Sequence, residues 1–506
     1  MSTPIRRQYL SIKRQYPDVI VFFRLGDFYE TFDDDAKTAS RVLDITLTSR
    51  SGMGQQNRVP MAGIPYHAAQ GYIARLVGAG HKVAVVEQVG EPNGRDLVER
   101  RVMRVVTPGT VTDPSMLEST SNRYIAAALS EGSRAGLAIA DLSTGEFLTT
   151  EINAPDRAAA LSSLQREFLR VRPTEIVVPE REDDTEDELL GALPDGAFVS
   201  GLQRRAWRLE TAGDELRRHF EVETLDAFGC MGKPFAVRAA GALLQYLAET
   251  QLGSLTQIVD LLTYSTERYM TLDAQTLRNL ELTESSRGER RHSLLGVLDV
   301  TQTPMGARLL RRWVGQPLLE LDEISGRQDA VAFFAERTLV RTRLRQQLNQ
   351  VSDIERLINR VVTGASGPRE LLALGRSLKQ LPEINDVLAD DQRPATVRLL
   401  PDCAQIAWLI TDALVDDPPA VLGASSSIRP GFSIELDTLR ESSRGAREWI
   451  AALEQTERER TGIRSLKVGY NKVFGYYLEV SHASSVLIPD DYQRKQTLVN
   501  AERYIT

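Results

Sequence analysis

Cysteine is nearly absent from this chain, and its scarcity excludes two classes of protein. Only Cys230 and Cys403 occur in 506 residues, and they stand far apart without metal-ligand spacing. A disulfide framework or a zinc site needs several cysteines at short, regular intervals. The sequence therefore predicts neither, and it favours a protein that works in a reducing compartment.

Long hydrophobic runs are also missing. No apolar stretch approaches the roughly 18 residues that a membrane-spanning helix needs. The N-terminus carries Arg6, Arg7, Lys13 and Arg14 but lacks the apolar core of a signal peptide. We expect a cytosolic protein with no membrane partner.

An overall positive charge is the third missing feature. The net charge is −8 and the isoelectric point is near 5.5, whereas a nucleic-acid-binding domain is usually basic on its contact face. Contact with nucleic acid would therefore have to depend on local basic clusters, and each of these could equally be an ordinary solvated face. The clusters are Arg6-Arg7, Arg100-Arg101 with Arg104, Arg204-Arg205 with Arg208, and Arg494-Lys495.

The most informative segment that is present is Phe28-Tyr29-Glu30. In an extended strand, residues two apart face the same way, so an aromatic ring and a carboxylate share one face. Such a pair suits a wedge that opens a base step in a DNA minor groove and then contacts the unstacked base. The alternative is a core strand with an acid at its exposed end.

Long stretches in a fixed order decide between these alternatives, because together they resemble the MutS family of bacterial mismatch-recognition proteins. The resemblance extends along essentially the whole chain. The stretches are 23–50, Pro60 to His67, Val105 to Thr110, Leu272-Asp273, Arg278 to Leu282, Leu298-Asp299, Thr303 to Gly306, Arg311 to Trp313, Glu457 to Gly462, Lys467 to Asn471 and Gly475 to Tyr477.

The resemblance and the residue patterns together predict a multidomain fold of α/β and α parts. Residues 1–113 are expected to form a mixed α/β mismatch-binding domain, and residues 122–235 a connector similar to ribonuclease H. A helical core is expected over 236–433. A lever helix and a small β-containing clamp should follow over 434–506, with the lever from Ile434 to Thr461. Asn500 to Thr506 should begin a return helix.

Two acids in the expected connector allow a different function. Asp141 and Glu146 could belong to a two-metal nuclease, which needs clustered carboxylates. The Asp-x-x-x-Gly-Glu spacing also fits a hairpin turn with a solvated acid on either side, and no further acids at strand ends complete a metal clamp. We favour the hairpin and expect no metal site. A helical scaffold without mismatch preference is the second alternative.

The family resemblance implies roles for individual residues. Phe28 would insert beside the mismatch and Glu30 would discriminate, whereas Arg100, Arg101, Arg104, Lys467, Lys472, Arg494 and Lys495 would contact the DNA backbone. The carboxylate of Glu30 would be repelled by phosphates. It must therefore gain a compensating hydrogen bond to a displaced base edge, and a protonated acid could donate this bond.

Full-length relatives also carry an ATPase domain that binds ATP and Mg²⁺. A P-loop needs a glycine-rich turn followed by Lys and then Ser or Thr. The nearest string here, Gly229-Cys230-Met231-Gly232-Lys233-Pro234, has the wrong glycine spacing and ends in proline. We expect no catalytic residues in this chain, a truncation before the ATPase domain, and, in the full-length form, a homodimer with a MutL-type partner.

Overall fold

The computed structural model describes residues 4–51, 58–89, 98–180, 188–194, 196–253, 255–420, 422–423, 426–471 and 475–506. The chain forms two compact units, residues 1–410 and residues 411–506. Within the described residues, no helix combines the length and the apolar character that a bilayer crossing requires.

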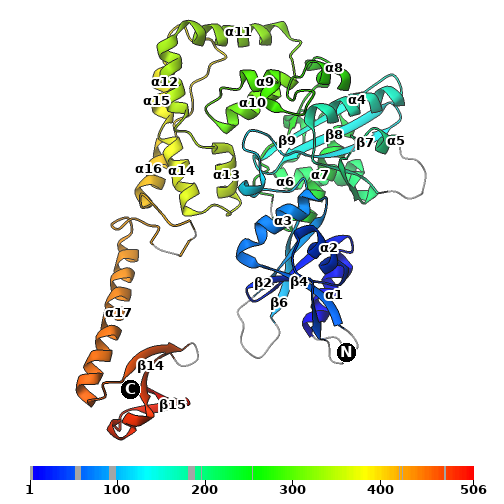
Figure 1. Ribbon diagram of the computed structural model, residues 1–506. Coiled ribbons are helices and arrows are strands. Elements are labelled where there is room, and N and C mark those ends of the chain that lie inside the picture. Colours follow the sequence, from blue (N-terminus) through cyan, green and yellow to red (C-terminus); the bar gives the residue numbers. More distant parts are fainter. Residues whose placement is uncertain are drawn as a thin grey trace. The chain divides into compact units, whose positions relative to one another are not determined.

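The first unit begins with a six-stranded mixed sheet in the order β3-β4-β2-β1-β5-β6, where β1 and β5 run parallel and the other neighbours run antiparallel. Helices α1, α2 and α3 accompany it (Figure 1). The bounds are α1 Pro4–Gln15, β1 Val19–Leu25, β2 Phe28–Phe32, α2 Asp33–Leu43, β3 Thr48–Ser51, β4 Arg58–Pro65, α3 Ala69–Gly78, β5 Lys82–Val89 and β6 Glu99–Val106.

Strand β1 is central because nearly all its side chains are apolar. Successive side chains alternate between the two faces of a sheet, so Phe22 packs with Tyr29 on the face that α2 and α3 cover, and Phe23 packs with Phe32 on the face that α1 covers. A strand with two buried faces is expected to read as a continuous apolar run. Residues Val19 to Phe23 are such a run, and all five are buried.

A second six-stranded sheet follows, in the order β11-β10-β7-β8-β9-β12. Strands β7, β8 and β9 form an antiparallel meander, and β10 pairs parallel with both β7 and β11. The bounds are β7 Ile125–Glu131, β8 Arg134–Asp141, β9 Glu146–Asn153, α4 Arg157–Val171, β10 Glu175–Pro179, α5 Glu188–Gly191, β11 Phe198–Leu202, α6 Leu209–Phe220, α7 Pro234–Gln251 and β12 Leu262–Thr263.

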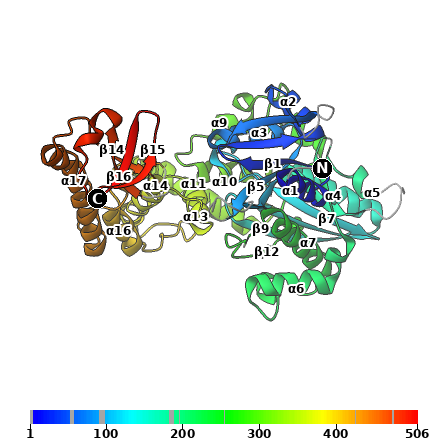
Figure 2. The same cartoon turned by 90° about the horizontal axis from the view of Figure 1, so that it is seen from below.

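Helix α7 corrects the expected boundary at residue 235. We expected it to open the helical core, but it packs with α6 against the second sheet (Figure 2). Gly136 of β8 allows this contact, because a Cβ there would lie 2.1 Å from the carbonyl oxygen of Phe235. Amphipathic periodicity shows that a helix buries one face, but not which sheet receives that face.

Helices dominate the remainder of the first unit. Helices α9 and α10 are separate, because Thr303 accepts a hydrogen bond from the N–H of Gly306 and caps a new start at Pro304. The bounds are α8 Ala274–Asn279, α9 Leu294–Leu298, α10 Pro304–Gly315, α11 Leu321–Glu336, α12 Thr338–Leu348, α13 Ile354–Val362, α14 Pro368–Leu378, α15 Leu381–Leu388 and α16 Ala404–Ala413, the last extending into the second unit.

The second unit contains the long helix α17, Ile434–Thr461, with the predicted bounds. Ser433 caps its start and Gly462, at φ 72°, ends it in the left-handed conformation. An antiparallel sheet follows in the order β13-β14-β16-β15. The bounds are β13 Lys467–Asn471, β14 Gly475–Ser481, β15 Gln493–Thr497 and β16 Ala501–Ile505.

The expected return helix is wrong, because residues 501–505 form strand β16 between β14 and β15. Tyr504 is buried there with Leu478, Val480 and Tyr492. The short segment gains more from a central place in a sheet than from one turn of isolated helix, which is unstable by itself.

Candidate nucleic-acid interface

Phe28 begins β2 directly after a tight turn in which Gly26 has φ 61°. Glycine takes this left-handed conformation without strain. Phe28 lies opposite Leu25 of β1 and Pro65 of β4, so its backbone is held from both sides. Its side chain nevertheless remains 48% exposed. A large ring that is half exposed at a strand end is not a core residue, and its insertion into DNA stays a prediction.

Glu30 lies on the same face of β2 as Phe28, as the two-residue spacing predicted. Its Cα partners are Phe23 of β1 and Gly63 of β4, and its side chain is partly buried. A Cβ at Gly63 would lie 3.6 Å from the Cγ of Glu30, so the glycine leaves room beside the carboxylate.

Behind Phe28, a polar and aromatic cluster stabilises β2 from the opposite face. The hydroxyl of Tyr29 donates to Glu87, and the guanidinium of Arg24 lies 3.7 Å from the centre of the Tyr66 ring. The N–H of Tyr66 donates to the carbonyl of Asp27 at 3.0 Å. Burial, followed by the hydrogen bond to Glu87, raises the pKa of Tyr29 to about 12. These contacts tie the Phe28 turn to β4 and β5.

The three arginines of β6 are not equivalent. Arg100 donates to the carbonyls of Arg24 and Val98, at 2.8 and 2.9 Å, and stacks on Phe23. Arg101 is exposed and forms a surface ion pair with Glu99 at 2.8 Å. Arg104 contacts Gln70 at 3.5 Å. The geometry favours Arg101 and Arg104 for phosphate contacts and gives Arg100 a structural role.

In the second unit, the expected cations lie on the terminal sheet. Lys467 on β13 and Lys495 on β15 are exposed, and Arg494 pairs with Glu502 at 3.0 Å. Lys472 lies outside the described residues. The sequence reasoning missed Tyr470 and Tyr476, which are exposed and lie directly opposite one another with ring centres 5.1 Å apart. The signal that could have identified these two residues was their position opposite one another in two neighbouring strands.

Asp141 and Glu146 do not form an acidic cluster. Asp141 is fully buried, where we expected a solvated acid, and its oxygens accept from Asn122, Ser143 and the backbone N–H of Arg123. Glu146 accepts from Tyr124 and forms an ion pair with Arg312 at 2.9 Å. Both carboxylates are therefore occupied by protein donors, and among the described residues no cluster of potential metal ligands occurs.

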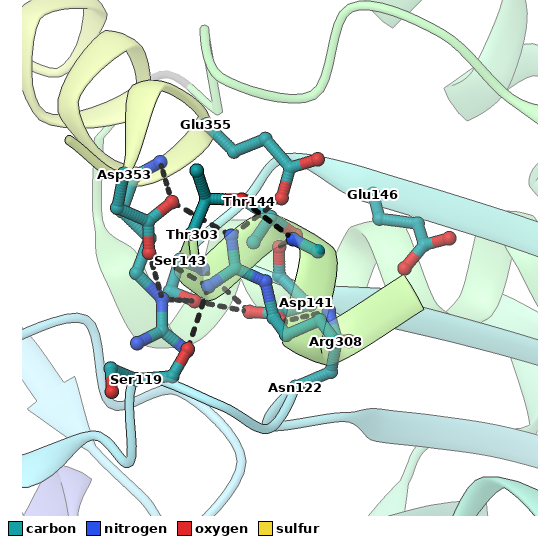
Figure 3. A network of polar contacts seen from close by, with 12 residues as sticks. Ser119, Asn122, Asp141, Ser143, Thr144, Glu146, Thr303, Arg308, Asp353 and Glu355 are labelled. Atoms are coloured by element: carbon teal, nitrogen blue, oxygen red, sulfur yellow. Dashed lines mark hydrogen bonds and ion pairs between the residues drawn. The ribbon is translucent and has the colours of Figure 1, made fainter. Parts of the chain in front are cut away.

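These donors belong to a network that joins three parts of the first unit (Figure 3). Arg308 of α10 donates to the carbonyl of Ser119 and forms paired contacts with Asp353, all between 2.7 and 2.9 Å. Arg356 of α13 donates to the carbonyls of Glu118 and Ser121. The linker between the two sheets is thus held by helices that come some 200 residues later in the sequence.

The string Gly229 to Pro234 does not fit a bound triphosphate. Pro234 is the first residue of α7 and has no N–H, and Lys233 folds back to donate to the carbonyl of Gly229 at 3.1 Å. The next N–H, of Phe235, already donates to the carboxylate of Glu151 at 2.8 Å. A carboxylate therefore occupies the helix terminus where phosphate would bind.

Comparison with known proteins matches nearly the whole chain to three family models: MutS domain I over residues 3–115, MutS domain II over 123–259 and MutS domain III over 275–500. The second match includes α7, in agreement with its packing on the second sheet.

Curated relatives named DNA mismatch repair protein MutS are similar along the full chain. The protein from Dehalococcoides mccartyi is 45% identical over 510 residues, that from Symbiobacterium thermophilum 46% over 511, and that from Methanosarcina acetivorans 43% over 524. Each alignment covers 100% of this chain but 58% of the relative. The chain thus spans little more than half the length of these proteins.

Proposed function

Since this chain belongs to the MutS family, we propose that it recognises mismatched or unpaired bases in duplex DNA and serves DNA mismatch repair. The observation that carries the proposal is the half-exposed ring of Phe28 on a braced strand end, with the Glu30 carboxylate on the same face. Packing within the protein does not explain why half of this ring is exposed, whereas insertion at a base step would use the exposed half.

Selection would depend on how easily the DNA deforms. Inserting an aromatic ring unstacks a base step at a cost of a few kcal/mol, and the cost is lowest where a base is mispaired or unpaired. A protein that inserts Phe28 therefore prefers such sites without reading the sequence around them. The turn at Gly26 and the contact from Tyr66 to Asp27 would keep the ring in place.

Glu30 would add discrimination. A carboxylate among phosphates is repelled by about 1 kcal/mol per charge at 4 Å, even at the dielectric constant of water. A hydrogen bond to a displaced base edge would offset that repulsion, and we expect this bond only where a base is out of register. Phe28 would thus contribute binding, and Glu30 would make binding depend on the mismatch.

Backbone contacts would come from Arg101 and Arg104 in the first unit and from Lys467, Arg494 and Lys495 in the second. The sheet after α17 would act as the clamp and α17 as the lever. For the longer relatives as a class, the proposal is that ATP and Mg²⁺ bind outside the residues matched here. These proteins would form homodimers, bind a MutL-type partner and work in the cytosol beside the DNA. We expect no ATP hydrolysis by these 506 residues.

A binding measurement on the chain as it stands tests the proposal. Fluorescence anisotropy would compare duplexes that differ only in one mismatched pair or one unpaired base with a fully paired duplex. We expect tighter binding to the two defective duplexes, weak overall affinity and a steep decrease with salt. Equal affinity for all three duplexes would support a helical scaffold, and cleavage of DNA that depends on a divalent metal would support the nuclease alternative.

A further inference from the structure

A small pocket of about 130 Å³ lies between α10, the end of α4 and the linker that leads into β7. Five arginines contribute to its lining: Arg170, Arg172, Arg308, Arg311 and Arg312. Five guanidinium groups around so small a space repel one another unless acceptors separate them. The way each charge is balanced therefore decides what the pocket can hold.

Four of the five arginines have a carboxylate partner within hydrogen-bonding distance. Arg170 pairs with Glu167, Arg172 with Glu284 at 2.6 Å, Arg308 with Asp353 and Glu355, and Arg312 with Glu146. Arg311 forms no ion pair within the described part of the chain. Its charge is partly buried, and burial, aided by the nearby charges of Arg172 and Arg290, lowers the pKa of its guanidinium despite the opposing charge of Glu118.

Two buried nitrogens belong to arginines that line this pocket. The Nε–H groups of Arg308 and Arg311 are buried and have no hydrogen-bond acceptor among the described residues. The two arginines are three residues apart on α10, so they share one face of that helix, and both line the pocket. Because a buried donor without an acceptor is unfavourable, two of them on residues that line one pocket indicate an acceptor that the protein does not supply.

We propose that this pocket binds a tetrahedral oxyanion such as inorganic phosphate, held by Arg311 and by the Nε–H of Arg308. Guanidinium groups bind phosphate oxygens through short, charge-assisted hydrogen bonds. The volume suits one phosphoryl group and is too small for a nucleotide, since a water molecule in the liquid already takes about 30 Å³. The two sources of such a group are free phosphate and a phosphate of the DNA backbone.

An anion in this pocket would also restrain the segments that line it. Ser121 and Asn122 of the linker line the pocket together with α10 and the C-terminal end of α4, and Arg308 holds the linker carbonyl of Ser119. An anion bound here would therefore contact both the linker between the two sheets and helix α10, and would restrain the linker. This consequence does not depend on the proposed role in mismatch recognition.

Direct binding of inorganic phosphate is the test. Equilibrium dialysis with radiolabelled phosphate, at ionic strength held constant with chloride, should show one saturable site on the chain. Arg311→Gln should weaken binding about tenfold or more, because a hydrogen bond to a charged group contributes roughly 1.5–3 kcal/mol. Arg343→Gln, which removes an exposed arginine of α12, should leave binding unchanged. Arg311→Lys, which retains the charge but loses the guanidinium fork, should bind with intermediate affinity.

Hydrogen exchange would locate the site and separate the two sources. Phosphate should slow exchange of the linker amides around residues 118–123 and of α10 in the natural chain but not in Arg311→Gln. A short paired duplex that displaces the labelled phosphate would identify the DNA backbone as the occupant, whereas phosphate that stays bound would identify the free anion. Non-saturable binding, or equal binding by Arg311→Gln, would overturn the proposal, as would protection confined to other segments.

Discussion

Arg308 and Asp353 form two parallel hydrogen bonds of 2.7 Å, from Nη1 to Oδ2 and from Nη2 to Oδ1. Arg308 is 3% exposed and Asp353 16%, so water screens this ion pair little. Two short bonds in one plane are the strongest arrangement available to an arginine and a carboxylate. The pair connects α10 to the start of α13 and, through Ser119, to the linker.

Asp353→Asn should lower the free energy of unfolding of the first unit by about 3 kcal/mol, because it removes the negative charge that faces the buried guanidinium of Arg308. The matched control is Glu355→Gln. Glu355 also contacts Arg308 but is 50% exposed, so its loss should cost less than about 1 kcal/mol. Urea unfolding followed by circular dichroism measures both, and equal effects would show that burial does not set the strength of this network.

Phe28→Ala should abolish the preference for mismatched DNA and leave stability within about 1 kcal/mol of the natural chain, because the ring is half exposed. Phe22→Ala is the contrasting variant, since Phe22 is 0% exposed and its removal should cost about 3–5 kcal/mol. Thermal unfolding and anisotropy on the same preparations separate the two effects. A large loss of stability in Phe28→Ala would make that ring a core residue and the wedge hypothesis wrong.

Glu30→Gln should keep or strengthen binding to fully paired DNA, because it removes a negative charge that faces phosphates. The ratio between mismatched and paired affinities should therefore fall without a loss of overall affinity. Anisotropy titrations on both duplexes give this ratio directly. If both affinities fell by the same factor, the carboxylate would be a structural hydrogen-bond acceptor within the first sheet.

The raised pKa of Tyr29 predicts that the stability of the protein depends on pH in the alkaline range. Burial and the hydrogen bond to Glu87 raise its pKa to about 12, above the value of roughly 10 in an unfolded chain. The folded state therefore favours the neutral phenol, and this stabilisation is complete below pH 10 and is lost as the pH rises through 12. The difference in melting temperature between the natural chain and Tyr29→Phe should decrease across that window. A difference that stays constant up to the highest pH would contradict the assignment.

Lys495→Gln should weaken binding to mismatched and paired duplexes by the same factor, because a contact to phosphate carries no information about the bases. The slope of log affinity against log salt concentration should decrease by about 1. Lys379→Gln, which removes an exposed lysine of the helical part, serves as the control and should change neither quantity. A selective loss on mismatched DNA would place Lys495 near the bases.

Local patterns in the sequence were sufficient for several features. Ser433 and Gly462 define α17, because a side-chain cap and a left-handed glycine act within a few residues. The shared face of Phe28 and Glu30 follows from the two-residue period of any strand. The apolar run at Val19 to Phe23 is typical of a buried strand. These features depend on neighbouring residues alone, so they could be predicted before any tertiary contact was known.

Tertiary structure decided what depends on contacts between distant residues. The segment Ala501 to Ile505 becomes a strand because β14 and β15 lie on either side of it. Helix α7 joins the second sheet because Gly136 allows its backbone to approach. Asp141 is buried by donors from the linker, and Arg100 is engaged by carbonyls of β1 and of Val98. Arg311 meets Arg170 and Arg172 across about 140 residues of sequence. Packing energy and electrostatic balance over such separations belong to the folded chain as a whole, and no local pattern of residues encodes them.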